Sequence, residues 1–93
     1  MAGDITEDEA LQRRRRRLIF RSDHRGNKEN DILLGQFAQS HVMEFDAAQL
    51  ERYEALLEES DNDIFDWIAG RAEIPPDKDS DVLRLLLAFQ VTF

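Results

Sequence analysis

Cysteine is absent from the chain, and only two prolines and four glycines occur in it. Without cysteine there is no disulfide framework, no thiolate zinc site and no cysteine nucleophile. The longest uninterrupted apolar run, Leu85 to Phe89, is far too short to cross a bilayer, so we expect no membrane insertion. These absences favour a folded protein of a reducing compartment, and we expect the cytoplasm.

The chain is also short, at 93 residues. A domain of this size buries roughly 60 to 65 per cent of its extended surface, which leaves little room for a deep pocket. We therefore expect a single domain, residues 1–93, that acts as a binding module rather than as an enzyme. The amino end is acidic, unlike the basic start of a signal or transit peptide, so we expect the chain to begin at its own Met1.

Motifs that carry catalysis or metal binding are missing as well. The two histidines, His24 and His41, do not stand at a metal-ligand spacing. The sequence has no glycine-rich phosphate loop and no G-x-S-x-G nucleophile elbow. We expect no catalytic residue and no metal site, and we interpret Trp67 as a core residue.

Charge is distributed unevenly, although the formal net charge is −8. Residues 10–28 hold eight Arg or Lys against one acid, whereas residues 44–81 hold thirteen acids against three bases. The low pI argues against nonspecific nucleic-acid binding, while the basic end could steer an acidic partner. Arg13 to Arg17 go right round a helix, so some must lie with their stems beside Leu11 and Leu18. A solvated helix and a phosphate-binding or partner-steering patch are both open interpretations.

Apolar spacing predicts an all-α fold, a small five-helix bundle without a sheet. The helices are expected at residues 6–21, 28–41, 47–59, 64–70 and from Asp79 or Ser80 to Phe89. Asp46 and Gln49 stand at capping-box spacing, and Gly35 within the second helix indicates a close helix contact. We expect residues 1–5 to be flexible and residues 90–93 to fray.

A polar stretch, residues 24–31, separates the first two predicted helices and contains charges of both signs. In one interpretation Gly26 turns the chain, the asparagine after it caps the next helix, and Arg25 pairs locally with Glu29 or Asp31. In the other, bidentate donors, acceptors and an open backbone lie together. That combination suits recognition of a folded partner.

Three blocks of the sequence together resemble a known family. The first is Arg25-Gly26-x-x-Glu29-x-Asp31 with the apolar run after it, the second is residues 45–57, and the third is Asp63-Ile64-Phe65-Asp66-Trp67-Ile68. In order and spacing these blocks resemble the succinate dehydrogenase flavinylation factors, small helical proteins of bacteria and mitochondria. The resemblance extends over about residues 13–89.

The resemblance implies a five-helix protein that binds the flavoprotein subunit of succinate dehydrogenase, with fumarate reductase as a related target of bacterial members. Such a protein promotes covalent attachment of FAD to a histidine of that subunit. We expect this chain to be bacterial and cytoplasmic. FAD would belong to the partner, and this chain would hold no cofactor stably and act as a monomer. Carried over by motif, the partner contacts would be Arg25, Gly26 and Glu29, with Asp31 and His24 beside them.

Two other classes of function stay open. An antitoxin-like or nucleic-acid-associated regulatory protein would use the basic end from Arg13 to Arg17, although the overall acidity leads us to expect no nucleic-acid partner. A stand-alone enzyme is disfavoured by the short chain and by the missing nucleophile.

Overall fold

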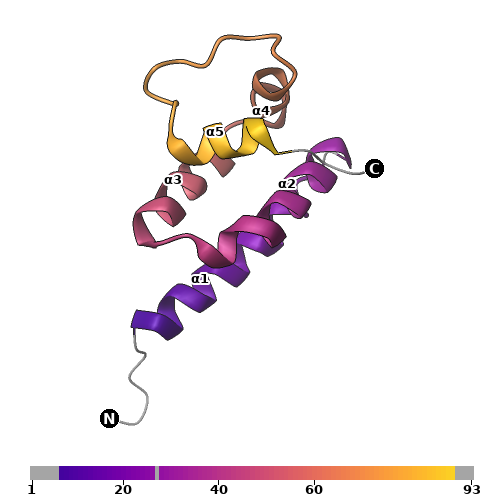
Figure 1. The fold of residues 1–93 in the computed structure, drawn as a ribbon. Helices are drawn as coiled ribbons and strands as arrows, with labels where there is room; N and C mark the ends of the chain where they lie inside the picture. The colour runs from indigo at the N-terminus through magenta and orange to yellow at the C-terminus, as the bar shows by residue number, and fades with distance from the viewer. Residues whose placement is uncertain (1–6, 27, 90–93) are drawn as a thin grey trace, which may run out of the picture.

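The computed structural model describes residues 7–26 and 28–89, and within them the chain forms five α-helices, one short 3-10 helix and no strand (Figure 1). The all-α prediction is confirmed. The elements are α1 (Glu7–Ser22), α2 (Lys28–His41), the 3-10 helix η1 (Val42–Glu44), α3 (Ala47–Leu57), α4 (Asp61–Ile68) and α5 (Asp81–Ala88). No helix in this described part is long and apolar enough to span a bilayer.

Three helices begin at a polar residue that caps them. At α3 the predicted capping box is present: Asp46 Oδ1 accepts from the Gln49 backbone N–H at 2.8 Å, and Gln49 Oε1 accepts from the Asp46 backbone N–H at 3.1 Å. Ser80, not Asp79, caps α5. Ser60 caps α4, and each of these oxygens satisfies an N–H that has no partner within its helix.

The start of α4 was predicted wrongly. The helix was expected from residue 64, but it begins at Asp61 and ends at Ile68. Ser60 and the acids after it look like a turn in the sequence, yet a serine cap followed by Asp61 and Asp63 suits the positive end of a helix dipole. The predictions for residues 1–5, for an asparagine cap at residue 27 and for residues 90–93 lie outside the described residues.

One hydrophobic cluster joins all five helices. Its most deeply buried members include Leu18 of α1, Phe37 of α2, Tyr53 of α3, Ile64 of α4 and Leu86 of α5. The side chain of the sole tryptophan, in α4, is also buried, which confirms its interpretation as a core residue. Burial of apolar surface on every helix supplies the main driving force for this fold.

Helices α1 and α2 approach closely at Gly35, as the sequence suggested. A Cβ atom at Gly35 would lie 2.9 Å from Cβ of Asp23, the residue that follows α1. Only a residue without a side chain fits this crossing. The contact therefore holds the end of α1 against α2 and places the described part of the connection between them, residues 23–26.

Candidate functional site

Gly26 is the turning point of the connection between α1 and α2. Its φ of +93° lies in the region that residues with a side chain rarely adopt. A Cβ atom at Gly26 would meet no atom within 4 Å, so the backbone conformation, rather than a lack of space inside the protein, requires glycine. The residue is exposed, and its backbone is open to a partner.

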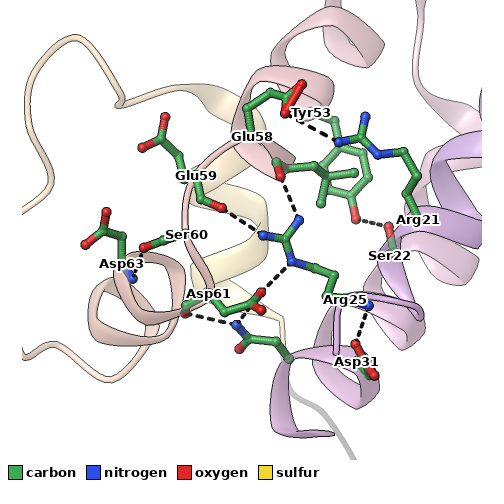
Figure 2. A network of polar contacts seen from close by, with 12 residues as sticks. Arg21, Ser22, Arg25, Asp31, Tyr53, Glu58, Glu59, Ser60, Asp61 and Asp63 are labelled. Carbon is green, nitrogen blue, oxygen red and sulfur yellow. Dashed lines mark hydrogen bonds and ion pairs between the residues drawn. The ribbon is translucent and has the colours of Figure 1, made fainter. Parts of the chain in front are cut away.

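Arg25 points from this connection into the molecule, as Figure 2 shows. Its guanidinium donates from Nε to Asp61 Oδ1 at 2.5 Å, from Nη1 to the Leu57 carbonyl at 2.7 Å and from Nη2 to the Glu59 carbonyl at 2.8 Å. Only 12% of the side chain is exposed. Carbonyls at the end of a helix lack partners within it, and a cation placed there satisfies them and suits the dipole. The fork of Arg25 thus caps the end of α3.

Asp61 and Asn30 complete a clamp with Arg25, and neither was predicted as a site residue. Asn30 is fully buried, and its Nδ2 donates to the Asp61 carbonyl at 2.9 Å and to Asp61 Oδ1 at 3.2 Å. Asp61 therefore accepts from both sides of Gly26 on the chain, from Arg25 in the connection and from Asn30 in α2. We call Arg25, Asn30 and Asp61 the clamp. It joins the α1–α2 connection and α2 to the first residue of α4.

The predicted local ion pair of Arg25 with Glu29 or Asp31 is wrong. Asp31 Oδ1 instead accepts from the Arg25 backbone N–H at 2.7 Å, which leaves the guanidinium free to reach Asp61. Glu29 is exposed in the first turn of α2, and within the described residues its carboxylate has neither a hydrogen-bond nor an ion-pair partner. The two carboxylates that the motif contains therefore face different surroundings.

His24 is exposed and lies flat on Phe20, with ring centroids 3.9 Å apart. Its Nδ1–H donates to the Phe20 carbonyl at 2.8 Å and pairs with Asp23. The Phe20 carbonyl, more than the Asp23 carboxylate, raises the pKa of His24 above its ordinary value. Within the described part of the chain, no group of three or more histidines and carboxylates is arranged to hold a metal ion.

Ser22 and Tyr53 anchor the end of α1 to α3. Both side chains are buried, Ser22 Oγ donates to the Leu18 carbonyl at 2.7 Å, and the Tyr53 hydroxyl lies 2.5 Å from Ser22 Oγ (Figure 2). Burial raises the pKa of Tyr53 to about 12. This contact fixes the last residue of α1, directly before the connection.

The structure thus divides the five predicted site residues into two groups. His24, Gly26 and Glu29 are exposed, whereas Arg25 and Asp31 turn toward the protein and hold the connection in place. We call the exposed three the outer face of the connection. They offer open backbone, a carboxylate and an imidazole to a partner, on a connection that the clamp bonds to α4.

The sequence of residues 16–90 matches a protein family described as the flavinator of succinate dehydrogenase. This match includes the whole connection and the clamp. The chain belongs to this flavinator family. The resemblance noted from the sequence motifs is confirmed.

Individual relatives agree with the family. The chain is 40% identical over 84 residues to the mitochondrial succinate dehydrogenase assembly factor 2 of Dictyostelium discoideum, covering 90% of this chain and 57% of that protein. It is 39% identical over 84 residues to the mitochondrial assembly factor 2-B of Drosophila erecta, covering 88% and 54%. It is 40% identical over 86 residues to the FAD assembly factor SdhE of Acetobacter pasteurianus, covering 92% and 78%. The chain thus spans little more than half of the mitochondrial relatives.

These relatives contradict the prediction of a bacterial, cytoplasmic location. The factors from Dictyostelium discoideum and Drosophila erecta are named as mitochondrial, although the family also has a bacterial member in Acetobacter pasteurianus. The prediction rested on the missing cysteine and the acidic amino end. Neither feature distinguishes one reducing compartment from another.

Proposed function

We propose that this chain binds the flavoprotein subunit of succinate dehydrogenase, or of the related fumarate reductase, and promotes covalent attachment of FAD to it. The names of the family and of the relatives support this role. The structural observation that carries it is the outer face of the connection, an exposed positive-φ glycine next to an unpaired Glu29 on a clamped support. A partner backbone can approach Gly26 as it could approach no other residue type.

In this proposal the chain is an assembly factor and not a catalyst. FAD supplies the redox chemistry, a histidine of the partner supplies the nucleophile, and this chain holds neither cofactor nor metal. Glu29 and His24 contact the partner, while Arg25 and Asp31 position the connection. Docking stabilises a conformation of the flavoprotein in which attachment occurs, because the chain binds that conformation more tightly than others. We propose that it does so as a monomer.

Two glycines of the chain allow a matched test. Gly26 and Gly70 both have positive φ, and at both a Cβ atom would meet nothing within 4 Å, so Gly26→Arg and Gly70→Arg carry similar backbone strain. Only Gly26 belongs to the connection. Each variant is co-expressed with the flavoprotein subunit, and covalent flavin fluorescence is measured on a denaturing gel. We expect Gly26→Arg to abolish labelling and Gly70→Arg to retain it.

Two results would count against the proposal in different ways. Equal labelling with Gly26→Arg and Gly70→Arg would remove the connection from the mechanism. Equal labelling of the subunit with and without the wild-type chain would remove the function itself. Glu29→Gln, which keeps the shape of the side chain without its charge, separates the contribution of the carboxylate from that of the open backbone.

A further inference from the structure

Exposed residues of α1 form a single line along the helix. Arg13, Arg16, Arg17 and Phe20 stand at positions i, i+3, i+4 and i+7, which places them on one face of α1, and His24 follows after the helix ends; all five are exposed. We call these five residues the α1 stripe. Its helical part, from Arg13 to Phe20, runs roughly 10 Å along α1 at 1.5 Å per residue.

The arginines of the run separate into two kinds, as the helical period requires. Arg14 and Arg15 turn toward the protein, where Arg14 pairs with Glu54 and Arg15 Nη2 donates to the Phe45 carbonyl at 2.7 Å. Arg13, Arg16 and Arg17 have no ion-pair partner within the described residues. The interpretation that the arginine stems lie beside the core therefore accounts for Arg14 and Arg15. It does not account for Arg13, Arg16 and Arg17.

Several exposed bases elsewhere in the protein, unlike these three arginines, are paired with an acid. Three other exposed bases, Arg52, Lys78 and Arg84, each pair with a carboxylate. The acids Asp8 and Glu9 line a shallow hollow with Arg13 and Arg16 at the amino end of α1. At the other end of the stripe Asp23 pairs with His24, while Arg17 has no ion-pair partner within the described residues. An acidic protein thus keeps a row of three arginines on one helix that form no ion pair within the described residues.

An aromatic platform stands at the end of this row. Phe20 is 62% exposed, the highest value among the large apolar side chains that the structure describes. His24 stacks on it with an angle of 12° between the rings and is itself held by the Phe20 carbonyl. A fixed aromatic pair next to arginines has the composition of the energetic centre of a protein interface.

We propose that the α1 stripe is a second docking surface, which binds an acidic patch on the folded flavoprotein subunit and steers that subunit onto the connection. This inference rests on the proposed function. Continuity along the chain supports it, since the stripe ends at His24, two residues before Gly26. Arginine rows attract an acidic partner over several ångströms and accelerate its encounter, while Phe20 slows its dissociation.

The charge distribution favours a protein partner over nucleic acid or an anionic membrane. Residues 44–81 carry thirteen acids against three bases, and the net charge is −8. An extended polyanion would bring its charges within the Debye length, about 8 Å at physiological salt, of this acidic part. Three free arginines also fall short of the roughly 6 to 10 phosphate contacts of a typical DNA-binding protein. A local acidic patch on a folded partner would contact only the α1 stripe and would stay away from the acidic part of this protein.

Two triple variants test the role of the arginines with matched charge. Arg13→Gln/Arg16→Gln/Arg17→Gln removes the stripe's guanidiniums, and Arg52→Gln/Arg71→Gln/Arg84→Gln removes three exposed arginines elsewhere. Each variant removes three positive charges, so the net charge becomes more negative by the same amount in both. Association with the purified flavoprotein subunit is measured by stopped flow from low to physiological salt. At low salt we expect the stripe variant to associate about ten-fold more slowly and with a weaker salt dependence, and the control to match the wild type.

Phe20→Ala tests the aromatic platform separately, with Leu85→Ala as its control because Leu85 is also exposed and lies in α5. We expect Phe20→Ala to raise the dissociation rate about ten-fold or more and Leu85→Ala to leave it unchanged. Wild-type rates and salt dependence in the stripe triple variant would overturn the inference. So would tighter wild-type binding to a DNA duplex or to anionic vesicles at physiological salt. A wild-type chain that does not bind the subunit at all would instead refute the proposed function.

Discussion

At the scale of single residues, the clamp depends on the shape of arginine more than on its charge. The guanidinium of Arg25 reaches three acceptors at once, and a lysine ammonium at the same position cannot span them. We expect Arg25→Lys to lower the free energy of unfolding by about 2 to 4 kcal/mol. Urea denaturation followed by fluorescence of Trp67, the sole tryptophan, measures the change. Arg71→Lys, at an exposed position, is the control, and an equal effect of both variants would contradict the clamp.

Tyr53 offers a second prediction at this scale, because it is the only tyrosine and its titration is directly visible in absorbance. Burial raises its pKa to about 12 in the folded protein, against 10.0 for a free tyrosine. The folded state therefore keeps its proton where the unfolded state loses it. Stability is complete below pH 10 and falls between pH 10 and 12, by up to about 1.4 kcal/mol per pH unit. Phenolate formation by the folded protein near pH 10 would contradict this prediction, and the urea-unfolded chain provides the reference.

Site residues were predictable from the sequence only where their partners are local. The reciprocal bonds of Asp46 and Gln49 join residues three apart, so spacing alone predicts them. The partner of Arg25 is Asp61, 36 positions away, and the two nearer acids were equally reasonable choices on charge. Sequence spacing carries no information on which distant acid the fold brings to the end of α3. The direction in which the Arg25 side chain points was therefore known only from the structure.

At the scale of elements, the crossing of α1 and α2 depends on Gly35. Alanine at a helical position is favoured over glycine by up to about 1 kcal/mol, which alone would stabilise α2. Against this, the new Cβ would lie 2.9 Å from Cβ of Asp23, an atom fixed to the backbone that cannot rotate away. Overpacking of this kind costs about 1 to 3 kcal/mol, so the clash outweighs the propensity. We expect Gly35→Ala to lower the midpoint of thermal unfolding.

Gln39→Ala, at an exposed position of the same helix, is the control for Gly35→Ala, and circular dichroism measures both midpoints. An increase in stability with Gly35→Ala would show that the two helices separate at little cost. Because this crossing places the connection, we also expect Gly35→Ala to reduce flavin attachment by more than its loss of stability explains. Full attachment at a temperature where the variant is folded would contradict that expectation.

Helices were the most predictable feature because their signals are periodic and repeated. Apolar spacing located α2 and α5 closely, since several residues of each helix report the same face. The start of α4 was missed because Ser60, a cap, and the acids after it also occur in turns. Because serine is common both as a helix cap and in turns, Ser60 alone does not show in the sequence where α4 begins. Its neighbours in space decide between the two.

At the scale of the whole molecule, the protein is bipolar in a way that suits its two proposed surfaces. The basic residues gather in α1 and the connection after it, whereas acids dominate residues 44–81. The clamp joins these two regions through Arg25 and Asp61. Attraction between the regions stabilises the fold, while the arginines that the fold leaves unpaired face outward and remain available to a partner.

All five helices share one hydrophobic cluster, so we expect the chain to unfold in a single cooperative transition. Trp67 reports on α4, and circular dichroism at the helical wavelength reports on every helix, with α1 and α2 contributing the longest segments. Urea curves from the two probes should coincide, and their midpoint should not change with protein concentration if the chain is a monomer. Loss of helical signal before the tryptophan transition would mean that α1 separates from the bundle on its own. A midpoint that rises with concentration would mean instead that copies of the chain associate, with the unpaired arginines of one meeting the acids of another.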